Sequence, residues 1–171
     1  MESVFDLPAH PLFVHTPLVL MPLLALAAIA VALRPRWRQA FGPVLIVASV
    51  VLVGVTVMAT QSGEQFDNLL EDQGVEIDIE DHQSLGEATQ TLVLVFAALL
   101  VGSSTVAMVG ARRRGSHSTG ASGALGWAGH ALAVAAVVLG VLGSIWMFRT
   151  GHEGAKLVWD GTIPSEQSGD E

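Results

Sequence analysis

Four long apolar runs divide the 171-residue chain and limit what it can fold into. The runs are Leu12–Leu33, Val44–Ala59, Thr91–Val109 and Leu125–Phe148. A helix that crosses a bilayer needs about 20 mostly apolar residues, and the second run reaches that length once Phe41, Gly42 and Thr60 are added. A soluble core would spread its apolar residues along the chain at helix or strand spacing. The pattern therefore predicts an all-α integral membrane protein with four spans.

We interpret the first run as a membrane span and not as a secretory signal peptide. The segment before it, Met1–Ala9, is acidic instead of basic, and no small-residue cleavage site followed by a polar stretch appears. The chain has no cysteine, which excludes disulfides, thiolate metal sites and covalently attached haem. Any iron or copper must therefore be held by His, Met or carboxylate side chains.

Charge predicts the orientation of the spans. Two predicted short loops hold six of the eight Lys and Arg residues: Arg34, Arg36, Arg38, Arg112, Arg113 and Arg114. Because basic loops stay on the cytoplasmic side, both termini and the loop between the second and third spans are expected on the extracytoplasmic side of an up-down four-helix bundle. The sixteen acids lie in those outer segments or the adjoining helix ends. We expect a plasma (inner) membrane protein with an extracytoplasmic functional face, and the net charge of −8 argues against nucleic acid as a partner.

The spans form one predicted transmembrane domain, residues 1–161, followed by a tail at 162–171. The predicted spans cover about 12–33, 41–60, 88–109 and 125–148. The tail is acidic and contains Gly and Ser, a composition that is typical of disorder.

The outer loop is predicted to continue the second helix and then to turn. Apolar residues up to Leu70 keep a helical spacing, and Gly74 is expected to end the helix. The alternation at Val75–Glu80 predicts a short extended segment. The third helix is then expected to begin near Asp81, with either Asp81 or Ser84 as its N-cap. Ser84 is a candidate because a glutamate stands three residues after it, which is the capping-box spacing.

The outer ends of all four helices carry polar residues that a membrane boundary does not normally offer. Ionisable groups at such a boundary are costly unless they have partners, which makes them candidates for function. Four of the six histidines lie in this layer. Its members are His10, His15, Gln61, Glu64, His82, Glu87, Gln90, Arg149, His152, Glu153 and Lys156.

Imidazole without thiolate suits haem iron, copper, zinc or nickel. Glycines beside the histidines favour haem, because a flat macrocycle needs a helix surface trimmed to hydrogen. Gly86 is one turn from His82, and Gly151 and Gly154 flank His152. The same glycines also fit plain roles as helix caps and turns. Helices one and three can lie on a diagonal of the bundle, so His15 becomes the candidate that faces His82 across the iron of a haem b.

The remaining residues of the layer receive supporting roles in this hypothesis. His10 and His152 are candidates for the second ligand or for propionate partners, and the cations Arg149 and Lys156 suit propionates. The carboxylates of Glu64 and Glu87 would orient the imidazole rings and tune the potential. The fourth helix starts at the inner side, and His130 lies about one turn into it. His130 is roughly 27 Å from Phe148 at the outer end at helical rise, so we do not expect it in this site.

Four motifs resemble the family catalogued as domain of unknown function 2231 (DUF2231). They are His-Pro-x-x-Val-His-x-Pro at 10–17, Ser-Gly-Glu at 62–64, His82 with Leu-Gly-Glu at 85–87, and Gly-His-x-Gly-Ala-x-Leu-Val-Trp at 151–159. The resemblance covers about residues 5–161, although Thr16 stands where the family usually has an aromatic residue. It implies a four-helix membrane protein. Members of the family look like haem-binding electron-transfer modules, and some are joined to Rieske or cytochrome c domains. We expect no such domain in this chain, so the resemblance does not identify its redox partner.

The favoured hypothesis is a membrane b-type haem protein that exchanges electrons with a redox partner protein or a larger respiratory-type complex. Two alternatives stay open at this point. One is a non-catalytic accessory subunit of a larger membrane complex, whose histidines only satisfy polar contacts. The other is a divalent-metal-binding membrane protein that uses the same His and Glu residues. No nucleophile and base stand at a recognisable spacing, which favours a carrier or subunit over an enzyme with its own turnover.

Overall fold

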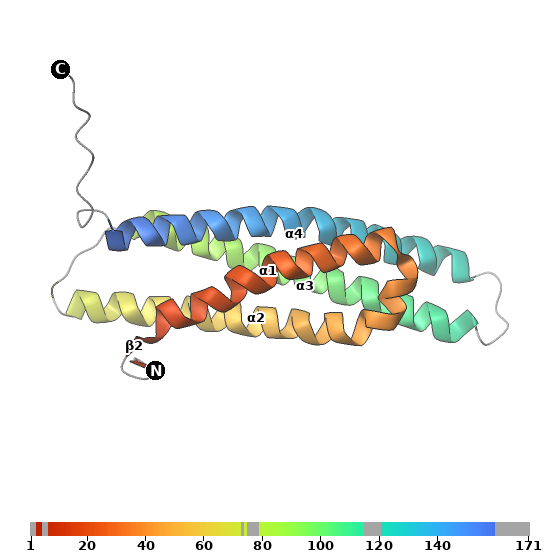
Figure 1. Cartoon of the computed structure of the whole chain (residues 1–171), viewed down its shortest axis with the longest axis horizontal. Helices are drawn as coiled ribbons and strands as arrows, with labels where there is room; N and C mark the ends of the chain where they lie inside the picture. Colours follow the sequence, from red (N-terminus) through yellow and green to blue (C-terminus); the bar gives the residue numbers. More distant parts are fainter. Residues whose placement is uncertain (1–2, 5–6, 73, 75–78, 115–120, 160–171) are drawn as a thin grey trace, which may run out of the picture.

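The computed structural model is helical apart from a short ribbon that precedes the first helix (Figure 1). It describes residues 3–4, 7–72, 74, 79–114 and 121–159. The ribbon pairs β1 (Ser3–Val4) with β2 (Leu7–Pro8) in antiparallel register. The helices are α1 (Ala9–Leu33), α2 (Pro35–Asp72), α3 (Glu80–Arg114) and α4 (Ala121–Trp159). Most of the predicted extended segment at 75–80 and the whole predicted tail at 162–171 lie outside the described residues.

The four helices form the predicted up-down bundle. Each helix packs on its neighbours in the sequence, and α4 also packs on α1, which closes the ring (Figure 1). Helices α1 and α3 therefore lie on one diagonal of the bundle, and α2 and α4 lie on the other.

The two ends of the bundle differ in charge. We call one the acidic end, where α1 and α3 begin and α2 and α4 end (Figure 1). The acids there with described side chains are Glu64, Asp67, Asp72, Glu80, Asp81, Glu87 and Glu153. We call the other the basic end, where α1 passes into α2 and α3 ends. Its arginines with described side chains are Arg34, Arg36, Arg38 and Arg112.

The outward faces of the bundle are apolar. Val19, Leu26 and Val44 are each more than half exposed, whereas the outward face of a water-soluble bundle is polar. All four helices contain a stretch long and apolar enough to cross a membrane. The protein is therefore a membrane protein with four candidate spans, as the apolar runs predicted.

The interior is packed from all four helices around Met21, Leu52 and Phe96. Glycine brings α4 close to this core. A Cβ on Gly140 would lie 3.0 Å from the Cβ of Ala25 and 3.0 Å from Cε2 of Phe96. Small residues at such contacts let the backbones of membrane helices approach each other, which fixes the position of α4 and of the side chains at its ends.

The described structure extends α2 and α3 beyond the membrane runs at the acidic end. Helix α2 continues to Asp72, and Gly74 follows in the left-handed region with φ 73°, which confirms the predicted helix extension and its glycine stop. Helix α3 begins at Glu80, and the amide of Gln83 already donates to the Ile79 carbonyl at 2.8 Å. The predicted N-caps Asp81 and Ser84 are therefore wrong, since both residues lie inside the helix.

The turn at the basic end is shorter than predicted. Arg34 alone separates α1 from α2, because Pro35 starts the second helix at once, a position that proline favours. The prediction that Arg38 belongs to a loop is wrong. This residue lies in α2 with 3% of its surface exposed.

Candidate functional site

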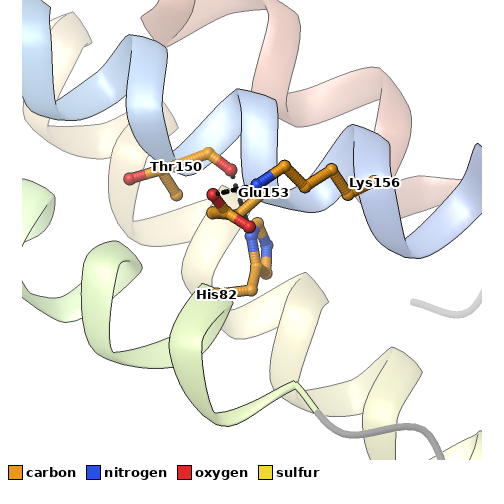
Figure 2. Close-up of polar contacts among 4 residues, drawn as sticks. All are labelled: His82, Thr150, Glu153 and Lys156. Carbon is orange, nitrogen blue, oxygen red and sulfur yellow. Dashed lines mark hydrogen bonds and ion pairs between the residues drawn. The ribbon is translucent and has the colours of Figure 1, made fainter. Parts of the chain in front are cut away.

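Among the predicted site residues, His82 makes the best-defined contacts between helices. It lies in the first turn of α3, is half-buried, and turns its ring toward α4 (Figure 2). Its Nδ1 atom lies 3.1 Å from the backbone carbonyl oxygen of Thr150. Because a carbonyl oxygen only accepts hydrogen bonds, Nδ1 carries the hydrogen, and the lone pair of the neutral ring is on Nε2.

Gly154 lets the imidazole of His82 lie against the backbone of α4. A Cβ at this position would be 2.8 Å from Cε1 and 3.2 Å from Nδ1 of His82. From its place in the sequence, Gly154 was expected to clear the helix surface beside its neighbour His152 for a haem. The structure shows that it clears space for the ring of His82, which comes from another helix.

Two threonines extend the contact between α3 and α4. The hydroxyl of Thr150 donates to the Trp146 carbonyl at 3.0 Å, so Thr89 is the donor in the 2.9 Å bond between the Thr89 and Thr150 hydroxyls. Thr89 is buried. Sequence reasoning missed both residues, although Thr89 is two turns from His82 and therefore on the same face of its helix.

Thr89→Val should weaken the contact between α3 and α4, because the variant loses the donor to Thr150. We expect a loss of about 0.6 kcal/mol in the free energy of unfolding, the average for a hydrogen bond between membrane helices. Thr91→Val is the matched control, since the exposed Thr91 hydroxyl bonds to the Glu87 carbonyl of its own helix. Unfolding in mixed SDS micelles, followed by circular dichroism, measures both. Equal stability of the two variants would contradict the assigned role of Thr89.

The two histidines of α1 are less firmly placed. His15 is exposed on α1, which lies diagonally across the bundle from α3. His10 lies in the first turn of α1, but its side chain is outside the described part of the chain. The pairing of His15 with His82 across one iron therefore stays a prediction, and so does the role of His10 as a second ligand or propionate partner.

The predicted residues of α4 lie near its C-terminal end, where Arg149, His152 and Lys156 are exposed. The ring of His152 stacks on Phe148 with 6.4 Å between centroids. The guanidinium of Arg149 lies 5.2 Å from the centre of the Trp146 ring. Lys156 pairs with Glu153 at 2.8 Å (Figure 2). These partners all come from α4 itself, and the cations remain at the surface, where an anionic group can reach them.

Glu64 and Glu87 both have exposed side chains, on α2 and α3. Their predicted roles in orienting imidazole rings stay predictions. Gly86 lies one turn after His82, and no atom from outside its own helix lies within 4 Å of the place where its Cβ would be. The helix surface beside His82 is therefore flat and open at that position.

The chain matches one known protein family. A family model described as "Predicted membrane protein (DUF2231)" matches residues 6–167. Searches of curated proteins and of solved structures found no match. Because the family match spans nearly the whole chain, and four apolar helices pack as the sequence motifs implied, this protein belongs to the DUF2231 family of predicted membrane proteins.

Proposed function

We propose that this protein binds a non-covalent b-type haem at its acidic end through His82 and transfers electrons to or from a partner. The observation that carries the proposal is the bond between Nδ1 of His82 and the Thr150 carbonyl. Metal-binding histidines usually donate their second ring nitrogen to a carbonyl or carboxylate, which fixes the tautomer and makes the ligand more basic. The bond gives His82 that tautomer, with Nε2 as the ligand atom.

The surface next to His82 supports a flat ligand. Gly154 lets the ring of His82 lie against α4, and Gly86 leaves the neighbouring turn of α3 without a side chain. Bound haem would supply one-electron redox chemistry at this place. The chain would contribute the imidazole of His82, with His15 from α1 as the candidate second ligand, and the cations Arg149 and Lys156 as partners for propionates.

The hypothesis of a divalent-metal protein gains no support from the structure. Among the described residues, no group of three or more His, Asp or Glu side chains is placed to hold a metal ion. A haem needs only one or two protein ligands, so this finding does not weigh against it.

A second candidate function is an accessory subunit in which His82 only joins α3 to α4. The same contacts favour it, because the bond to Thr150 and the pair of threonine hydroxyls both run between these two helices. The two candidates differ in one property, since only the first predicts stoichiometric binding of haem.

Titration of the detergent-purified protein with haemin distinguishes the two candidates. For the wild type we expect a Soret band that saturates at one haem per chain. Loss of an outer-shell partner lowers metal affinity by roughly 10- to 100-fold, and we expect His82→Ala to lower the affinity for haemin by more than that. His130→Ala is the control, because His130 is exposed on α4 in the basic half. If circular dichroism shows that the wild type and His82→Ala are both folded, and the two bind haemin equally weakly, the haem proposal fails. The accessory subunit then remains as the candidate function.

A further inference from the structure

Arg38 is a buried cation at the basic end of the bundle. Its residue surface is 3% exposed, whereas Arg34 and Arg36 nearby are exposed. Its Nη1 donates to the carbonyl oxygen of Gly129, so the side chain runs from α2 to α4 on the opposite corner. Its Nε is also buried and has no hydrogen-bond partner among the described residues.

Gly129 makes room for this side chain, and a second glycine, Gly42, brings a third helix into the same layer. A Cβ on Gly129 would lie 3.4 Å from Nη1 of Arg38 and 3.2 Å from Cγ1 of Val106. One turn after Arg38, a Cβ on Gly42 would lie 2.9 Å from Sδ of Met108 and 3.7 Å from the Cβ of Ser104, both on α3. The guanidinium therefore lies in a layer formed by α2, α3 and α4.

Ser104 supplies a second buried donor without a partner. It is fully buried, and within the described structure its hydroxyl makes no hydrogen bond. The adjacent Ser103 is equally buried, but its hydroxyl donates to the Leu100 carbonyl at 2.9 Å. Buried polar groups nearly always have a partner, so two unsatisfied donors in one layer require an explanation.

Among the described residues, no acid lies at this end to neutralise Arg38. Neither residues 7–63 nor residues 88–152 contain a single Asp or Glu. A buried charge needs a partner of opposite sign, and the described residues around Arg38 offer none, so a bound anion is the partner that fits. The surrounding field is positive, because the exposed Arg34, Arg36 and Arg112 belong to the same end.

We propose that Arg38 and Ser104 bind a phosphate group at the basic end of the bundle. A guanidinium presents several donors in a plane that matches phosphate oxygens, and the serine hydroxyl adds one more. Basic pockets between membrane helices take the headgroups of anionic lipids, and a free phosphate ion carries the same chemistry. This site lies at the opposite end from His82 and is independent of the haem proposal.

Thermal unfolding of the delipidated protein in detergent tests the site with three probes: dioleoylphosphatidylglycerol, zwitterionic dioleoylphosphatidylcholine and inorganic phosphate. We expect phosphatidylglycerol at about ten times its Kd to raise the Tm by about 3–6 °C, and phosphatidylcholine to have little effect. An equal rise with inorganic phosphate would identify a free ion as the ligand. A rise with phosphatidylglycerol alone would identify a lipid headgroup.

Two pairs of variants assign the effect to the buried donors. Arg38→Gln should abolish the rise in Tm while the exposed Arg36→Gln keeps it. Ser104→Ala should reduce the rise while Ser103→Ala keeps it, and this second pair decides the matter if Arg38→Gln does not fold. The proposal is overturned if no probe raises the Tm of the wild type, if Arg36→Gln loses as much as Arg38→Gln, or if Ser104→Ala and Ser103→Ala behave alike.

Discussion

His82→Gly is expected to lose haem and to regain it when imidazole is added to the buffer. The substitution removes the proposed ligand and leaves a space the size of its ring between Gly154 and the Thr150 carbonyl. Imidazole that enters this space can donate to the same carbonyl and present its other nitrogen, as His82 does. We expect the Soret band to fall below detection without imidazole and to return at millimolar concentrations.

His152→Gly is the control for this experiment. His152 stacks on Phe148 at the surface of α4 and is exposed, so its loss should leave most of the haem affinity. If His152→Gly loses the Soret band while His82→Gly keeps it, the ligand has been misassigned. If imidazole restores nothing to a folded His82→Gly protein, the ring of His82 acts through packing alone.

Gly154→Ala is expected to lower haem affinity by about 10- to 100-fold, the range seen when the partner of a metal-binding histidine is lost. The new methyl group would lie 2.8 Å from Cε1 of His82, a distance that forces the ring away from α4 and from the Thr150 carbonyl. Crowding of this kind also costs stability, by about 1–3 kcal/mol. Haemin titration gives the affinity, and unfolding in SDS gives the stability.

Gly151→Ala adds the same methyl group one turn earlier on α4. A Cβ there would meet only Cδ1 of Leu18, at 4.0 Å, so we expect no loss of haem affinity and no loss of stability. Equal affinities of the two variants would show that the position of the His82 ring does not govern haem binding.

The apolar runs predicted the fold well because a bilayer leaves few choices. Each run had to become a helix that satisfies its own backbone, and short connections made sequence neighbours pack side by side. The spacing of apolar residues up to Leu70 and the glycine at 74 also predicted how far α2 extends. The start of α3 was predicted less well. Asp81 and Ser84 both have the side chains of N-caps, but the helix begins before them, at Glu80.

The site was predictable as a layer but not as a set of contacts. The topology of the bundle predicts which helix ends lie together, but it does not predict the direction in which each side chain points. The bond from His82 to Thr150 uses a backbone carbonyl, which no residue type marks in a sequence. Arg38 illustrates the same limit, because its neighbours Arg34 and Arg36 are exposed and only the contact with Gly129 distinguishes it.

The dithionite-reduced minus oxidised visible spectrum of the protein, purified in detergent from haem-sufficient cells, tests the proposed function most directly. We expect a Soret band that shifts on reduction in the wild type and in His130→Ala and that is absent from His82→Ala. A colourless wild-type protein that takes up no added haemin, or a His82→Ala protein with the full wild-type spectrum, would contradict it.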